Sequence, residues 1–205
     1  MQAYIYEQKK VGKYTVKVLQ DDDPMNPRAD CDNLATMICF HRNYNLGDEH
    51  NYDREGMDIL RKRKDIIWLP LFLYDHSGIT MNTTGFNDGW DSSCVGIIYI
   101  EKEKYRKEFN CKRVNKKKVY NFLKADVEEY DNYLTGEVYG YIVENEAGEN
   151  IDSCYGYSGN SEFALNEGIQ AAQAQIRYDI KQHIKQVKQW IRNHAPLEKR
   201  TGLMV

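Results

Sequence analysis

The stretch of residues 161–194 reads SEFALNEGIQAAQAQIRYDIKQHIKQVKQWIRNH, and it predicts the longest helix of the chain. Apolar side chains recur in it at steps of three and four residues, which is the period of one helix face. These side chains are Ile169, Ala172, Ile176, Ile180, Ile184, Val187 and Ile191. Ser161 opens the helix, and Pro196 follows its end because proline cannot continue a helix. We therefore expect a long C-terminal helix that lies on a sheet or projects from it, and a tail over residues 195–205.

A second amphipathic helix is expected near residues 115–134. Asn115 is a suitable N-cap, and Gly136 ends the pattern. The apolar positions between them are Val119, Phe122, Leu123, Val127, Tyr130 and Leu134. A shorter helix is expected over residues 53–64, with Met57 and Leu60 on its apolar side.

Short segments of alternating or continuous apolar residues predict strands in the first two thirds of the chain. Two hairpins are expected, one from residues 3–7 and 14–19 and one from residues 136–144 and 150–157. Further strands are expected at residues 37–41, 66–74 and 95–100. Together the elements predict one α+β domain over residues 1–205, with a sheet-rich body at 1–160. The domain would have a central, mostly antiparallel sheet of five to seven strands. It would also have two or three helices, including the long C-terminal one.

The composition fits an ordinary globular protein. The chain has 205 residues, of which 41% are hydrophobic, and a formal net charge of −3. It lacks both an N-terminal signal-peptide pattern and an apolar run long enough to span a membrane. Its five cysteines form no CxxC pair, which disfavours disulfides and a zinc ribbon. We expect a cytoplasmic protein with reduced thiols and no membrane partner.

The small net charge hides an uneven distribution along the chain. Residues 125–168 carry 11 acidic and no basic side chains, and basic segments lie on both sides of them. An acidic segment of this kind is a candidate contact for a basic protein surface.

The two basic segments predict nucleic-acid-binding surfaces. The first, residues 102–118, interleaves cations with aromatic residues. The second places cations at steps of four, four, three and four residues, which gives them one face of the long helix. The candidate binding residues are Lys102, Lys104, Arg106, Lys107, Lys112, Arg113, Lys116, Lys117, Lys118, Arg177, Lys181, Lys185, Lys188 and Arg192. The alternative is a solvated face, or one that pairs with the acidic residues 125–132 of the same chain.

Carboxylates and imidazoles gather in residues 21–50 and at residues 75 and 76. These residue types bind divalent cations, so a metal-dependent hydrolase or nuclease is an alternative function. It would use Asp23, Asp32, His41, Asp48, Asp75 and His76. The spacing matches no known metal loop, and Asp23-Pro24 and Asn26-Pro27 also predict plain turns. No catalytic motif such as GxSxG, a P-loop or HExxH is present. We therefore predict no metal, no cofactor and no catalytic residue.

Several motifs together resemble a family of small uncharacterised proteins of bacteriophages and mobile elements. They are Asp23-Pro24-Met25-Asn26-Pro27-Arg28, the run DNLATMICFHRNYNLGD at residues 32–48, Tyr74-Asp75-His76-Ser77-Gly78, Trp90-Asp91-Ser92 and Tyr133-Leu134-Thr135-Gly136. Ala35 stands where the family pattern would have glycine. The polar residues of these motifs are Asp23, Asn26, Arg28, Asp32, Asn33, His41, Arg42, Asp48, Asp75, His76, Trp90 and Asp91.

The resemblance implies an accessory protein that works in the cytoplasm of a bacterial host. Small phage proteins of this kind often inhibit host defence, so the resemblance implies an anti-CRISPR-like inhibitor. Its partner would be a ribonucleoprotein or RNA of the defence system. A structural or replication accessory protein of a phage is the further alternative.

Overall fold

The computed structural model describes residues 4–87 and 92–200. The α+β class, the antiparallel pairing and the long C-terminal helix are confirmed. The strands form two four-stranded sheets, whereas we expected one sheet of five to seven strands. Alternation along a strand shows which face is buried and says nothing about which strand lies beside it. Two compact units result: unit 1 comprises residues 1–20 and 139–205, and unit 2 comprises residues 21–138.

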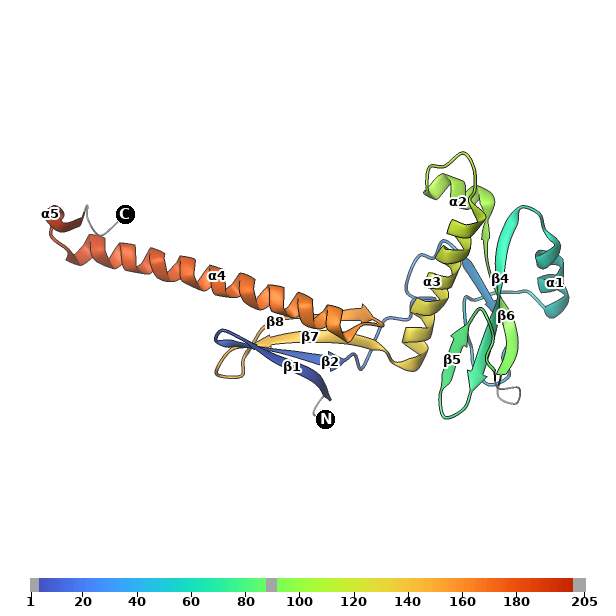
Figure 1. Cartoon of the computed structure of the whole chain (residues 1–205), viewed down its shortest axis with the longest axis horizontal. Coiled ribbons are helices and arrows are strands. Elements are labelled where there is room, and N and C mark those ends of the chain that lie inside the picture. The colour runs from blue at the N-terminus through green and yellow to red at the C-terminus, as the bar shows by residue number, and fades with distance from the viewer. Residues whose placement is uncertain (1–3, 88–91, 201–205) are drawn as a thin grey trace. The chain divides into compact units, whose positions relative to one another are not determined.

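Unit 1 is a sheet covered by the first half of the long helix. Its strands are β1 (Ile5–Val11), β2 (Tyr14–Gln20), β7 (Val138–Glu144) and β8 (Asn150–Ser158), in the order β1-β2-β7-β8. The helix is α4 (Ser161–His194), and Figure 1 shows its first turns lying along this sheet. Gly168 permits close packing, because a Cβ there would lie 2.5 Å from a methyl group of Val16. The core of the unit, which includes Val16, Val143 and Ala172, is buried in this layer.

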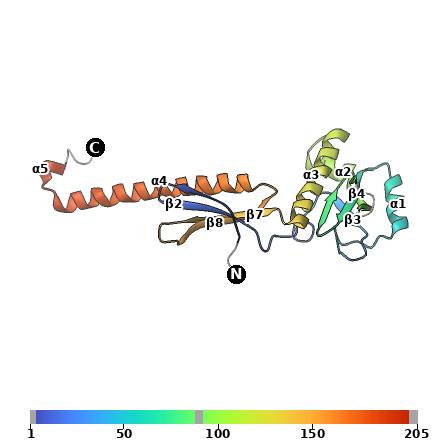
Figure 2. The ribbon, with the colours of Figure 1, turned by 60° about the horizontal axis from the view of Figure 1, so that its bottom comes forward.

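The second half of α4 continues past the strands of unit 1, as Figures 1 and 2 show. Ile180 and Ile184, which continue the apolar stripe, are 55% and 49% exposed. The expected stripe is therefore covered along the first half of the helix and largely open along the second, although Ile191 near the end of the helix is buried. A short helix, α5 (Leu197–Arg200), lies within residues 195–205, where we expected only a tail.

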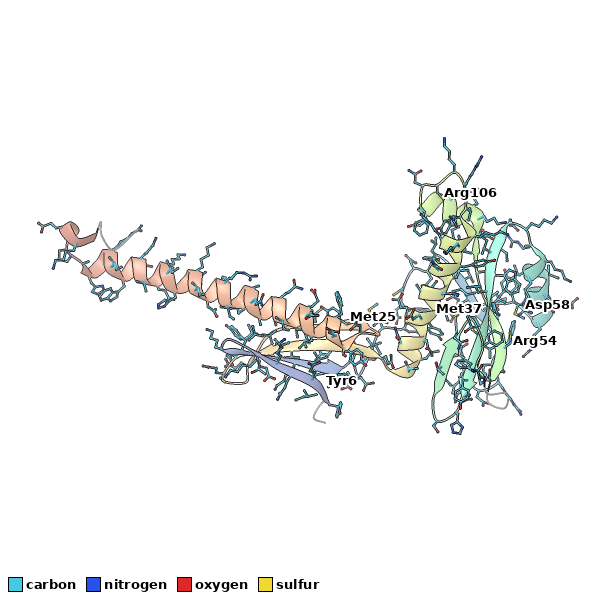
Figure 3. All side chains as sticks on the ribbon, viewed as in Figure 1. Tyr6, Met25, Met37, Arg54, Asp58 and Arg106 are labelled. Atoms are coloured by element: carbon cyan, nitrogen blue, oxygen red, sulfur yellow. The ribbon has the colours of Figure 1, made fainter. Side chains whose placement is uncertain are left out.

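Unit 2 is a sheet with helices on both faces. Its strands are β3 (Thr36–Cys39), β4 (Ile66–Asp75), β5 (Ile79–Asn82) and β6 (Ser92–Glu101), in the order β3-β6-β4-β5. On one face, Met37 and Ile98 pack in a cluster with α3 (Lys116–Thr135); Met37 is labelled in Figure 3. On the other face, Ile38 and Ile97 pack in a cluster with α1 (Arg54–Lys62). Successive side chains of a strand thus point to opposite faces of the sheet, where they pack in the two helical layers alternately.

The ends of the helices follow from capping residues. Asn115 accepts hydrogen bonds from the Lys117 and Lys118 amides, and Gly136 ends α3 in the left-handed conformation, as predicted. Asp53 caps α1 through the Gly56 amide. The seven-residue helix α2 (Lys102–Glu108) was not predicted. Tyr105 is its one buried residue, and a single apolar position gives no recurring helical pattern in the sequence. Among the helices of residues 4–87 and 92–200, none is both long and apolar enough to cross a membrane.

Candidate nucleic-acid interface

The second half of α4 carries a row of exposed cations. Arg177, Lys181, Lys185, Lys188 and Arg192 are all exposed, and their spacing keeps them on one side of the helix. None of the five forms an ion pair within residues 4–87 and 92–200. The row is therefore open to an external anion.

The acidic residue within this part of α4 does not neutralise the row. Asp179 accepts a hydrogen bond of 2.5 Å from the Tyr14 hydroxyl and lies 3.0 Å from the Lys13 ammonium. The hydrogen bond from Tyr14, with a smaller contribution from Lys13, lowers the pKa of this carboxyl below its ordinary value. Asp179 thus fastens α4 to the β1–β2 hairpin, on a different side of the helix from the cations.

The second basic surface is built by α2, the turn after it and the first turn of α3. Its exposed cations are Lys104, Arg106, Lys107, Lys112, Arg113, Lys116, Lys117 and Lys118. Tyr105 is buried and packs on Phe109 and Phe122, which fixes α2 against α3. Arg106 is labelled on α2 in Figure 3. Lys102, also a predicted binding residue, is half-buried and donates its ammonium hydrogen bond to the Lys64 carbonyl.

The first turn of α3 has an unusual charge. It contains Lys116, Lys117 and Lys118 and no acidic residue. The amino end of a helix carries a partial positive charge, so cations there are unfavourable and anions are favourable. A bound anion would relieve this repulsion.

The acidic segment is divided between the two units, and several of its charges have internal partners. Asp126 pairs with Arg28, and Asp131 accepts hydrogen bonds from the Thr80 hydroxyl and the Met81 amide. In unit 1, Glu144 pairs with Lys17 at 2.6 Å. The exposed acidic residues Glu128 and Glu129 lie on α3 in unit 2, whereas Glu146 and Glu149 lie in unit 1. The segment is therefore not one continuous acidic surface of either unit.

Arg28 is the centre of the polar cluster that the sequence motifs singled out. Its side chain is fully buried and donates two hydrogen bonds of 2.8 Å to Asp48, one of 2.7 Å to Asp126 and one of 2.9 Å to the Ala35 carbonyl. Burial lowers the pKa of Arg28, but the two carboxylates outweigh burial and raise it above its ordinary value. Four of the five N–H groups of the guanidinium are thus used within the protein, so Arg28 is a structural anchor.

The rest of the loop is held by amide side chains. Asn26 accepts a hydrogen bond from the Arg28 amide, and Asn33 donates to the carbonyls of Pro27 and Cys31. Asp23 and Asp32 are exposed. The structure therefore brings Asn26, Asn33 and Asp48 together around the Arg28 segment.

A polar pocket of about 750 Å³ opens beside the end of β3. It is lined partly by His41, Arg42, His50 and Arg54. His41 stacks on Tyr44, with 4.9 Å between ring centres, and the Tyr44 hydroxyl reaches Asp75 at 3.4 Å. His76 lies in the exposed turn after β4. Trp90 and Asp91 lie outside the described residues. No group of three or more His, Cys, Asp or Glu side chains able to hold a metal ion occurs in the described ranges.

Comparison of the chain with protein-family models, curated proteins and solved structures finds no match.

Proposed function

We propose that this protein is a non-enzymatic accessory protein that binds a polyanionic partner, a nucleic acid or a ribonucleoprotein, through its basic surfaces. The observation that carries the proposal is the row of five exposed cations on α4, none with an ion pair inside the described chain. Five helical cations on one side match the regular charge of a phosphate backbone.

The basic surface of α2 and α3 supports the same proposal independently. Its three lysines lie where a helix favours an anion, and its cations are exposed. Both surfaces recognise charge rather than base identity, so the expected binding depends strongly on salt and weakly on sequence.

From the resemblance to phage proteins, we propose that the accessory protein is an anti-CRISPR-like inhibitor of a host defence ribonucleoprotein. Such an inhibitor acts by occupying a surface and needs no catalytic group. The hydrolase alternative gains no support from the described residues, in which no metal-binding group of side chains converges.

Binding of a fluorescent 20-nucleotide RNA at a series of salt concentrations tests the proposal. We expect the triple variant Lys181→Gln, Lys185→Gln, Lys188→Gln to lower the slope of log affinity against log salt by about 2, since each lost phosphate contact removes roughly 0.7 for a single strand. The matched control is Lys9→Gln, Lys10→Gln, Lys62→Gln, which removes three exposed cations elsewhere. A purified protein that carries no nucleic acid and binds none at low salt would contradict the proposal.

The partner itself is identified by affinity purification from a bacterial host lysate, with protein and nucleic acid both analysed in the eluate. We expect wild type to retain a ribonucleoprotein or RNA that the α4 triple variant loses. Equal recovery with both proteins would show that α4 is not the binding surface.

A further inference from the structure

One edge of β4 in unit 2 is open along half of its length. Residues Ile66–Leu71 pair with β6 on one side, whereas β5 pairs only with Phe72–Asp75 on the other. Pro70 lies in this half and has no amide hydrogen to offer an added strand. The open edge is therefore poorly suited to strand addition, and recognition there depends on side chains.

A groove of about 540 Å³ runs along this edge. Three lysines line it: Lys64 before β4, Lys102 at the start of α2 and Lys116 at the start of α3. Trp68 of β4 and Tyr120 of α3 supply aromatic rings. The groove thus combines cations and aromatic rings that come from four parts of unit 2.

The charge of the groove is positive. Arg63, which also lines it, is neutralised by Asp65 at 2.5 Å and Glu101 at 3.1 Å. Lys64 and Lys116 make no ion pair in the described part of the chain, and no Asp or Glu is among the described lining residues. The ammonium groups of these two lysines are available to a phosphate.

The Trp68 ring is held in place, and the Tyr120 ring is exposed. The Trp68 indole donates its hydrogen bond to the Arg61 carbonyl at 3.2 Å, and the Arg61 guanidinium lies 5.4 Å from its ring centre. Tyr120 is 37% exposed on α3. Aromatic rings beside cations are the arrangement that stacks unpaired bases while it holds their phosphates. In a duplex the internal base pairs are stacked on both faces, so only the terminal pairs could stack on Tyr120.

We propose that this groove binds single-stranded nucleic acid, with a base stacked on Tyr120 and phosphates on Lys64 and Lys116. The inference rests on the proposed function, polyanion binding, and it adds a location and a ligand class. It also adds Lys64, Trp68 and Tyr120 to the binding residues, none of which the sequence motifs singled out.

Binding of a twelve-nucleotide oligouridine, an oligothymidine of the same length and a blunt duplex tests the groove. We expect Tyr120→Ala to weaken binding of both single strands by about tenfold, as loss of one stacked base does. Duplex affinity should stay within about twofold, because the internal bases of a duplex cannot stack on the ring. Tyr120→Phe should keep wild-type affinity, since it keeps the ring. Tyr4→Ala, at an exposed tyrosine that precedes β1 and lies outside both basic surfaces, is the control.

The outcomes separate the two proposals. If the single strands and the duplex bind wild type but Tyr120→Ala changes neither, the groove inference is wrong and the proposed function stands. If no oligonucleotide binds at low salt, the proposed function fails and the groove inference fails with it. An equal loss for single strands and duplex would overturn the stacking contact. Circular dichroism of each variant confirms that the fold is retained.

Discussion

Arg28 holds together four parts of unit 2 with a single side chain. Its guanidinium joins its own loop to the segment after β3, to the Ala35 backbone and to α3. A buried cation with two carboxylates contributes little net stability compared with apolar packing, but its removal leaves buried charges without a partner. The anchor therefore fixes one arrangement of the loop more than it adds to stability.

We predict that Arg28→Met destabilises the protein by about 3–5 kcal/mol, because Asp48 and Asp126 then lose their shared partner. Urea unfolding measures the loss. Combination with Asp48→Asn and Asp126→Asn should recover part of it, since no charge is then stranded. Arg42→Met, at an exposed arginine, should change stability by less than about 0.5 kcal/mol. A loss below about 1 kcal/mol for Arg28→Met would show that the network is dispensable.

The cysteines should differ widely in reactivity. Burial raises the pKa of the Cys39 thiol to about 12, whereas Cys31, Cys94 and Cys154 are exposed. Because the thiolate is the reactive form, we predict that iodoacetamide labels the three exposed cysteines at least about 100-fold faster than Cys39 in the folded protein. Peptide mass spectrometry measures each rate. In denaturing urea all five should react alike; fast labelling of folded Cys39 would mean that its site opens readily.

At the scale of elements, the helices show what a sequence can predict. The caps of α3 and the extent of α4 follow from local rules, since a cap and a periodic stripe act within one or two turns. Both terminal hairpins were likewise predicted. The seven-residue α2 and the four-residue β5 were missed, because so few residues give no period.

The candidate site was only partly predictable for a related reason. The cations of α4 form a local pattern and were identified from their spacing. Asp126 lies 98 residues from Arg28, and Tyr120 and Trp68 line one groove only because of the tertiary fold. Contacts between distant segments have no local pattern, so the anchor and the groove became visible only in the structure. The family resemblance drew attention to Arg28 but did not indicate its partner.

The first turn of α3 should show a conflict between stability and binding. We predict that Lys117→Glu with Lys118→Glu stabilises the protein by about 0.3–1 kcal/mol per residue at low salt, because the negative charges complement the helix dipole. The same variant should weaken RNA binding at least about tenfold, through charge reversal at the surface of α2 and α3.

Urea unfolding and RNA titration measure the two effects of this double variant. Lys124→Glu, at an exposed lysine in the interior of α3, is the control and should leave stability nearly unchanged. If the double variant gains stability and binds RNA as wild type does, these lysines are merely solvated.

At the scale of the whole molecule, the two units are connected by insertion. In the sequence, unit 2 lies between β2 and β7 of unit 1. The last paired residue of β2, Gln20, lies opposite the first paired residue of β7, Tyr139. Within unit 2, the Asp21 amide donates a 2.8 Å hydrogen bond to the Val138 carbonyl, so its two ends lie together. Each unit also has its own buried core. This is the pattern of a domain inserted at a hairpin turn.

We predict that unit 1 folds when residues 21–138 are replaced by Asn-Gly, because this pair makes the tight turn that a two-residue hairpin needs. Residues 21–138 should also fold as a separate protein. Circular dichroism and cooperative thermal unfolding test both chains. The shortened unit 1 should still bind RNA through α4. Its affinity should be lower than that of the full chain, because it lacks the cations of α2 and α3. An unfolded state in either chain would mean that the units depend on each other.

The inserted position of unit 2 also sets an order of events during synthesis. The β1–β2 hairpin leaves the ribosome before unit 2, whereas its partners β7, β8 and α4 follow only after the whole of unit 2. Val16 and Val18 of β2 are buried in the core that these later elements complete. At an elongation rate of about 5–20 residues per second this delay is on the order of ten seconds. During that time the hairpin presents an uncovered apolar face, while unit 2 can already fold. The strand β1 and the turn after it carry Lys9, Lys10 and Lys13. Their positive charge disfavours pairing of the exposed hairpin with another nascent chain.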